Sequence, residues 1–156
     1  MKYTHSRLCQ INHTGCFGCC GHTFGSKDEA DIAIKKNTLE FAEYTDKREF
    51  MNRSQELREC GICRNLIRLP NGKLGCPLHP AVNEEDLRVG HCDVEHLCKA
   101  AQLFDSWDEK KQKKFLRFIK KQKLDWYDYS IKIDNDELIN AFEAENPQTD
   151  CPFPGS

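Results

Sequence analysis

The sequence predicts a mainly α-helical single domain with a small irregular or β-hairpin region that is rich in cysteine. The chain has 156 residues, about the size of one domain with one core. Several segments combine a capping pattern with apolar residues at helical spacing. Nine of the ten cysteines lie between Cys9 and Cys98, and the tenth is Cys151. We therefore expect a cysteine-rich part over about 9–98, a helical part over about 99–146 and a tail over 147–156.

The composition is that of a polar globular protein. Charged residues make up 31% of the chain, hydrophobic residues make up 38%, and the formal net charge is −2. This charge argues against the overall electrostatic footprint of a nucleic-acid-binding protein. The N-terminus does not have the pattern of a secretory signal, and no apolar run is long enough to span a bilayer. We expect a cytoplasmic protein without membrane contact, where clustered thiols are more often metal ligands than disulfides.

Five segments are predicted to be helical. Ser26 and Glu29 form a capping-box pattern that opens a helix over 28–44. Ser106 and Glu109 repeat this pattern before a basic helix over 110–124. Residues 126–133 are interpreted as strand-like. The other helices are predicted at about 46–59, 93–106 and 136–146, the last of them capped by Asp134 and Glu137 and ended by Pro147.

Residues 60–79 carry a strong metal-binding pattern. The pattern is Cys60-x2-Cys63, twelve residues, then Cys76-x2-His79. The sequence Pro-Asn-Gly at 70–72 predicts a hairpin turn that would return the second pair of ligands to the first. A cage of four such ligands suits Zn²⁺, and thiolate cages also hold iron–sulfur clusters. The alternative, a redox Cys-x-x-Cys site, would need a surrounding βαβ pattern, which the sequence lacks.

A second cluster, HTGCFGCCGHTFG over 13–25, contains Cys16, Cys19 and Cys20. Cys16 and Cys19 are spaced so that both can reach one metal. Adjacent side chains point in different directions, so Cys20 is expected to face a second site or another edge of one polynuclear cluster. The glycines at 15, 18 and 21 allow the backbone to curl close to a metal and leave amides to donate to sulfur.

The cysteine-rich region is therefore interpreted as a metal-binding region with one or two centres. Zinc and an iron–sulfur cluster, such as a 4Fe-4S cluster, both fit the pattern as cofactor. An inert core thiol is an alternative for Cys98, and a solvated helix start is an alternative for His91 and His96. Cys9 and Cys151 are interpreted as bystanders. The predicted ligands are Cys16, Cys19, Cys20, Cys60, Cys63, Cys76, Cys92 and Cys98, with His13, His79, His91 and His96 as further candidates.

This cysteine pattern resembles that of the zinc- or iron-chelating domain family known for its Cys-x2-Cys-x2-Cys-Cys motif. The segment HTGCFGCCG over 13–21 is similar to the first block of that family, with His13 in place of the first cysteine. The segment CRNLIRLPNGKLGCPLHP over 63–80 resembles its second block. Some members of the family are associated with protein lysine methylation, such as that of flagellin. The resemblance covers roughly residues 13–98 and implies a metal on Cys16, Cys19, Cys20, Cys63 and Cys76.

The segment 110–123 places eight basic residues in fourteen positions. The aromatic residues between them make nucleic acid or an acidic partner one interpretation. A solvated helix face around an apolar stripe of Phe115, Phe118 and Ile119 is the preferred one, so nucleic acid is not the expected partner. The candidate nucleic-acid contacts are Lys110, Lys111, Lys113, Lys114, Arg117, Lys120 and Lys121.

The sequence thus predicts a cytoplasmic metal-binding protein and leaves its physiological role open. It has no convincing nucleophile–base pair, no phosphate-binding loop and no dinucleotide fingerprint, so it does not decide whether the protein is an enzyme. One alternative is an iron–sulfur enzyme or electron carrier, with a link to protein lysine methylation. The other is a module that binds nucleic acid or an acidic partner through residues 110–123. A protein partner is compatible with each of these interpretations.

Overall fold

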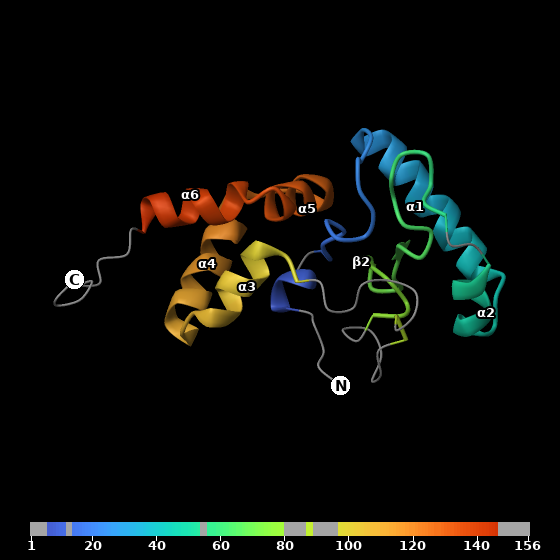
Figure 1. Cartoon of the computed structure of the whole chain (residues 1–156), viewed down its shortest axis with the longest axis horizontal. Helices are drawn as coiled ribbons and strands as arrows, with labels where there is room; N and C mark the ends of the chain where they lie inside the picture. The colour runs from blue at the N-terminus through green and yellow to red at the C-terminus, as the bar shows by residue number, and fades with distance from the viewer. Residues whose placement is uncertain (1–5, 12–13, 54–55, 80–86, 89–96, 147–156) are drawn as a thin grey trace.

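The computed structural model describes residues 6–11, 14–53, 56–79, 87–88 and 97–146. Within these ranges the chain is mainly helical, with a small two-stranded antiparallel sheet, as the sequence predicts (Figure 1). None of the helices in these ranges has the length and hydropathy that a membrane crossing requires. The elements are a short 3-10 helix (Arg7–Cys9), α1 (Lys27–Ala42), α2 (Lys47–Asn52), β1 (Ile67–Arg68), β2 (Leu74–Gly75), α3 (Lys99–Ser106), α4 (Glu109–Gln122), α5 (Trp126–Asp134) and α6 (Glu137–Glu145).

Helix α1 begins with the capping box that the sequence predicts. The Ser26 hydroxyl accepts a hydrogen bond from the Glu29 amide, and the Glu29 carboxylate accepts one from the Ser26 amide. These two bonds satisfy amides that the first turn of a helix leaves without an intrahelical acceptor. The buried face of α1 carries Ala30, Ala33, Ile34 and Asn37. This face lies against the β-hairpin and α2.

Two predicted helices are shorter than expected. The helix predicted at 46–59 ends at Asn52, and the Arg53 guanidinium donates to the Phe50 carbonyl in its last turn. The helix predicted at 93–106 begins at Lys99, and its residues 93–96 lie outside the described ranges. Cys98 is therefore the N-cap of α3 and does not lie on an apolar helical stripe.

Two cap assignments also differ from the prediction. Helix α4 is capped by the Asp108 carboxylate, which accepts from the Lys111 amide, while Ser106 is the last residue of α3. Helix α6 starts beside Asn135, whose side-chain oxygen accepts from the Glu137 amide. Asp134, predicted to cap α6, is the last residue of α5.

The strand-like interpretation of residues 126–133 is wrong, because these residues form α5. The Asp125 carboxylate accepts from the Asp128 amide and starts the helix. Tyr129, Ser130 and Ile133 are buried, and their spacing is that of one helical face. The burial of this face against neighbouring elements outweighs the strand propensity of its tyrosines and isoleucines.

The β-hairpin lies where the sequence predicts it. Strands β1 and β2 pair antiparallel, with Ile67 opposite Gly75 and Arg68 opposite Leu74. The connecting turn is closed by a hydrogen bond from the Gly72 amide to the Leu69 carbonyl, and Gly72 has φ of 85°. A positive φ of this size favours glycine, so the Asn-Gly pair fixes the turn.

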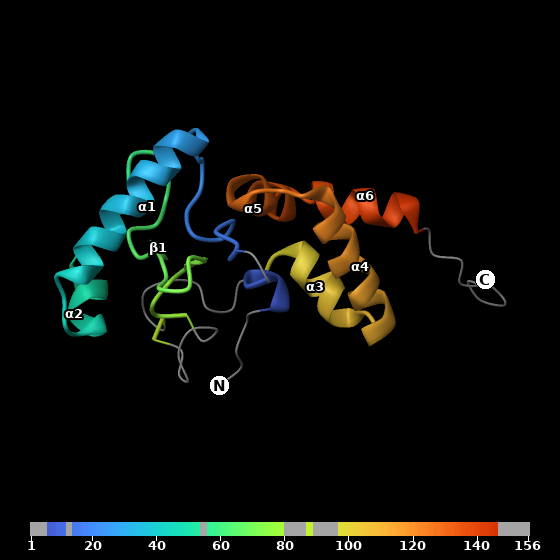
Figure 2. The ribbon, with the colours of Figure 1, turned by 180° about the vertical axis from the view of Figure 1, so that it is seen from behind.

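The elements form one body with two packed groups, seen from opposite sides in Figures 1 and 2. Helices α3 to α6 surround a core that includes Phe104, Phe115 and Phe142. Helix α1 and the hairpin share a second core around Ile34 and Leu66. The segment 6–25 runs between the two groups (Figure 1). Helix α5 joins them, because its Trp126 and Tyr127 pack on the second core while its Tyr129 is buried in the first.

Candidate metal centre

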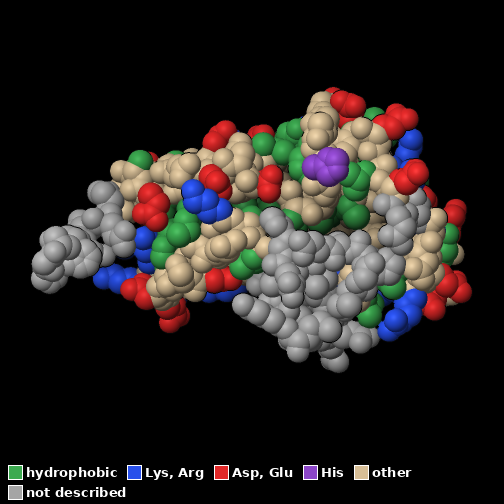
Figure 3. Space-filling view, in the orientation of Figure 1, with side chains coloured by type: hydrophobic (Ala, Val, Ile, Leu, Met, Phe, Trp, Pro, Cys, Tyr) green, Lys and Arg blue, Asp and Glu red, His purple; other side chains and the backbone are tan. Residues whose placement is uncertain are grey.

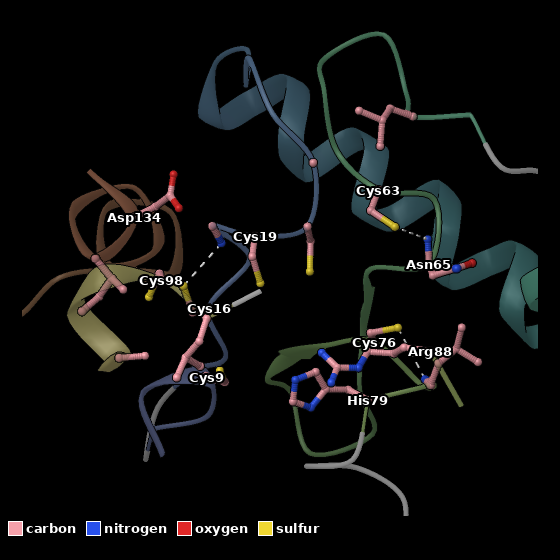
Figure 4. Close-up of a pocket in the computed structure, with 18 of the residues that line it drawn as sticks. Cys9, Cys16, Cys19, Cys63, Asn65, Cys76, His79, Arg88, Cys98 and Asp134 are labelled. Carbon is pink, nitrogen blue, oxygen red and sulfur yellow. Dashed lines mark hydrogen bonds between the residues drawn. The ribbon is translucent and has the colours of Figure 1, made fainter. Parts of the chain in front are cut away.

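A cavity of about 400 Å³ lies where the two groups meet, and seven of the residues that line it are cysteines (Figure 4). Its cysteines come from segment 6–25, from the chain on both sides of the hairpin and from the start of α3. His79, Arg64, Arg88 and Asp134 add polar groups to the wall. The cysteines that line the cavity are Cys9, Cys16, Cys19, Cys20, Cys63, Cys76 and Cys98.

The first thiol set consists of Cys9, Cys16 and Cys98. The chain turns back on itself between Gln10 and Gly15, which form an isolated antiparallel bridge. The Cys16 amide donates to the Cys9 carbonyl over 2.9 Å, so the two cysteines lie next to each other. Cys98 reaches them from the start of α3, and both Cys16 and Cys98 pack against the core of α3 to α6.

The second thiol set consists of Cys20, Cys63 and Cys76. The Cys63 amide donates to the Cys20 carbonyl over 2.9 Å, beside a bridge that follows Cys20 in the chain. This pairing brings the backbones so close that a Cβ at Gly61 would lie 2.1 Å from the His22 carbonyl oxygen. The hairpin then returns the chain and places Cys76 on the same side of the cavity as Cys63 (Figure 4).

Cys19 lies between the two thiol sets (Figure 4). Its thiolate would act electrostatically on Cys16 of the first set and on Cys20 and Cys63 of the second. The two adjacent cysteines therefore differ in their place: Cys19 lies between the thiol sets, and Cys20 belongs to the second set. The Cys19 and Cys20 side chains also interact with each other through a hydrogen bond, so the expectation that they diverge to separate sites stays a prediction.

Backbone amides donate to the sulfurs of Cys9, Cys16, Cys63 and Cys76. In three cases the donor is the residue two positions further along the chain, which is the geometry of a tight turn around the cysteine. An amide that points at sulfur stabilises the thiolate form, and thiolate is the form that binds metal. The four bonds, each 3.4 Å long, run from Gly18 to Cys16, from Asn65 to Cys63, from Leu78 to Cys76 and from Ser6 to Cys9.

Burial opposes ionisation of these thiols when no cation is bound. It raises the pKa of Cys9 to about 11, and the pKa of Cys16 well above its ordinary value. The Cys19 side chain and burial together raise the pKa of Cys20. Desolvation disfavours the charged form of each group. A metal that binds here would therefore displace protons and supply the positive charge that the buried thiolates need.

Zinc sites and polynuclear clusters hold their cysteine ligands at different separations. Within the described ranges, no three His, Cys, Asp or Glu side chains are placed so that they could hold one metal ion. A tetrahedral zinc site with Zn–S bonds of about 2.3 Å brings its sulfurs to roughly 3.8 Å from one another. A polynuclear cluster puts several metal and sulfide atoms between its ligands, so it tolerates a wider set of thiols.

The structure separates the predicted ligands into three groups. Seven of the predicted cysteines lie in the described ranges; all of these except Cys60 line the cavity, and His79 lines it too. Cys60 does not line it: its buried thiol lies 3.7 Å from the Glu29 carbonyl oxygen, in the core beneath α1. The predicted candidates outside the described ranges are His13, His91, Cys92 and His96.

Cys9 also lines the cavity, although the sequence gives it no metal-binding signal. It precedes Cys16 by seven positions, and this spacing does not occur in a Cys-x2-Cys or Cys-x2-His pattern. The short antiparallel turn between the two cysteines brings them together.

The basic residues of α4 lie on an amphipathic helix, whose buried face holds Phe115, Phe118 and Ile119. Lys111 is half-buried, with its ammonium group 4.4 Å from the centre of the Trp107 ring. On the face that Figure 3 shows, basic and acidic side chains are interspersed over the described residues. Nucleic-acid binding stays a prediction. The candidates on the exposed face are Lys110, Lys113, Lys114, Arg117, Lys120 and Lys121.

The chain matches no family model, no curated protein and no solved structure. The resemblance of its cysteine pattern to the chelating family therefore stays a prediction.

Proposed function

We propose that the protein binds an iron–sulfur cluster in the seven-cysteine cavity, with thiolates from the two thiol sets as ligands. The observation that carries this proposal is the convergence of seven thiols from separate parts of the chain on one cavity. A buried thiol is a small apolar group, and burial alone does not require seven of them to face one space. Metal binding does require it, because remote thiolates must meet around the metal.

Two further observations support a cluster over a single zinc ion. The cavity has a volume of about 400 Å³, and its seven cysteines are more than the four ligands that one zinc ion takes. The amides that donate to Cys16, Cys63 and Cys76 also suit a cluster, because hydrogen bonds to sulfur tune its reduction potential.

One iron–sulfur cluster uses four cysteine ligands. The cavity offers seven, so it has thiols for one cluster with further thiols beside it. Two four-ligand centres would need one ligand besides these cysteines, such as His79, which also lines the cavity. The iron content per chain distinguishes these arrangements. The proposal holds for either, since both require the same cavity.

We also propose that the protein works in a reducing compartment such as the cytoplasm. Thiols persist in reducing compartments, where clustered cysteines serve as metal ligands more often than as disulfides.

The proposal is tested by elemental analysis and absorption spectroscopy of the full chain purified without oxygen. Iron and acid-labile sulfide in stoichiometric amounts, together with the brown colour of an iron–sulfur protein, are the expected result. Colourless protein with zinc at full occupancy and no sulfide would contradict it. Protein with neither metal, after reconstitution with iron and sulfide, would contradict metal binding altogether.

A further inference from the structure

The turn that carries Cys63 is held by side chains from α1 and α2. Asn37 is fully buried, and its side-chain amide donates to the Cys63 carbonyl over 3.0 Å and to the Leu66 carbonyl over 2.8 Å. It thereby fixes both ends of the turn 63–66. A buried amide of this kind is stable only where its hydrogen bonds are made, so the turn and α1 are locked in one register.

Arg53 holds the middle of the same turn. Its guanidinium donates to the Asn65 side-chain oxygen over 3.0 Å and also to the Arg64 carbonyl. The arginine side chain is only 7% exposed, and its guanidinium carbon lies 3.8 Å from the centre of the Phe50 ring. The planar fork of an arginine suits this double contact, which a lysine cannot reproduce.

A polar network connects these two side chains. Arg58 donates to the Asn37 side-chain oxygen over 2.9 Å and pairs with Glu40. Arg53 also pairs with Glu40, at 3.3 Å. The polar frame is defined by Asn37, Glu40, Arg53 and Arg58.

The frame acts on one cavity sulfur in two ways. It fixes the Asn65 backbone, whose amide donates to the Cys63 sulfur over 3.4 Å. It also places a positive charge beside the turn that carries that sulfur, since the Arg53 guanidinium contacts Arg64 and Asn65, the two residues that follow Cys63. Apolar side chains could pack this site at a lower desolvation cost, so packing alone does not account for the frame.

We propose that Arg53, with Asn37, is a positioning residue that sets the reduction potential of the metal centre through Cys63. This inference rests on the proposed iron–sulfur function. The buried positive charge and the amide that Arg53 helps to orient both stabilise negative charge at the sulfur. Reduction adds negative charge to the centre, so both effects favour the reduced state and raise the potential.

The test compares full-length Arg53→Lys and Arg53→Met with wild type after anaerobic purification. The readouts are iron and sulfide content, reduction potential by spectroelectrochemical titration, and the electron paramagnetic resonance spectrum of the reduced protein. Arg53→Met is expected to shift the potential to more negative values. Arg53→Lys keeps the charge but loses the planar guanidinium group. Its potential is expected to lie between those of Arg53→Met and wild type, and its spectrum is expected to differ from that of wild type. Arg117→Met, on the exposed face of α4, is the matched control and should leave both readouts unchanged.

Three outcomes would overturn the inference or its basis. Both Arg53 variants could keep the wild-type potential and spectrum at full iron content. This result would overturn the role of Arg53 and leave the proposed cluster standing. An Arg53 variant that keeps its helical circular dichroism but binds no iron would also remove it, because Arg53 would then govern binding and not tuning. Wild-type protein without iron and sulfide would overturn the cluster, and this inference with it.

Discussion

At the residue scale, the cavity distinguishes cysteines that look equivalent in the sequence. Cys60 and Cys63 belong to one Cys-x2-Cys motif, yet only Cys63 lines the cavity. Cys60 lies near the Glu29 carbonyl, and the Cys63 amide pairs with the Cys20 carbonyl. Both contacts involve residues more than thirty positions away, so local spacing does not separate the two thiols.

This difference predicts unequal effects of two matched substitutions. Cys63→Ala is expected to lower the iron content of the purified protein, because it removes a cavity thiol. Cys60→Ala should keep the wild-type iron content and lose only packing beneath α1. Iron and sulfide assays on both variants, prepared side by side, check the prediction. Equal loss in the two variants would show that the motif binds as a pair, contrary to the placement of Cys60.

A second residue-scale prediction concerns Tyr129, which is buried in the core of α3 to α6. Its hydroxyl donates to the Leu8 carbonyl over 2.7 Å and so ties segment 6–25 to α5. Tyr129→Phe leaves a buried carbonyl without this donor and should lower the free energy of unfolding by about 1–3 kcal/mol. Tyr127→Phe removes a similar bond, to the Gly25 carbonyl, at a partly exposed site and should cost less. Urea denaturation of both variants measures the difference, and an equal or larger loss in Tyr127→Phe would contradict this account.

At the scale of elements, the sequence predicts helices well where local caps define them. Ser26 and Glu29 mark the start of α1, and the Asn-Gly turn marks the hairpin. The prediction fails for α5, whose aromatic and branched residues favour a strand locally but are buried along one helical face. It overestimates the length of α2. Arg53, the residue after the helix, makes contacts with the distant residue Asn65, which the local sequence does not show. Local signals therefore give the start of an element more reliably than its end.

The same limit applies to the elements of the candidate site. The sequence predicts two cysteine clusters and the hairpin that returns Cys76, and these signals are local. It gives no sign that Cys9 reaches the cavity or that Asn37 holds the Cys63 turn. Cys9 reaches the cavity through the antiparallel pairing of Gln10 with Gly15, and Asn37 meets Cys63 from a distant part of the chain. No periodicity in the sequence encodes either contact.

The packing of α1 against α2 and the Cys63 turn should depend on pH through Glu40. Burial opposes ionisation of Glu40, but the Arg58 and Arg53 guanidinium groups outweigh it and hold its pKa below the ordinary value of 4.5. The stabilisation is therefore fully present above pH 4.5 and is lost as the pH falls through the lower pKa of the folded state. Glu40→Gln should be less stable than wild type near neutral pH, and this difference should shrink in acid. Denaturation of both proteins from pH 7 to pH 3 tests this, and a difference that stays constant with pH would contradict it.

At the scale of the whole molecule, the cavity lies where two separately packed groups meet. The first thiol set packs with α3 to α6, and the second belongs to the chain around α1 and the hairpin. Helix α5 and segment 6–25 already join the groups through hydrogen bonds, such as the one from the Phe17 amide to the Ser130 hydroxyl. A cluster bound by both thiol sets would add a second connection, on the cavity side of the molecule.

This arrangement predicts a local effect of metal removal. Because metal-binding free energy adds to folding free energy, the protein freed of iron should melt at a lower temperature than the loaded protein. Amide hydrogen exchange should then accelerate most in the thiol turns around Cys16, Cys63 and Cys76, whose amides donate to sulfur. Helices α4 and α6, which share the aromatic core of Phe115 and Phe142, should keep their protection.

Hydrogen exchange read by mass spectrometry, on loaded and iron-free protein at one pH and temperature, resolves these segments. Cys60→Ala serves as the control, because it alters a cysteine outside the cavity and should show the same difference between loaded and iron-free states as wild type. Uniform loss of protection across both cores would mean that the metal stabilises the fold as a whole and not the junction. Unchanged protection at the thiol turns would mean that the metal does not bind between the two sets, since amides that donate to metal-bound thiolates cannot exchange as readily as those that donate to thiols.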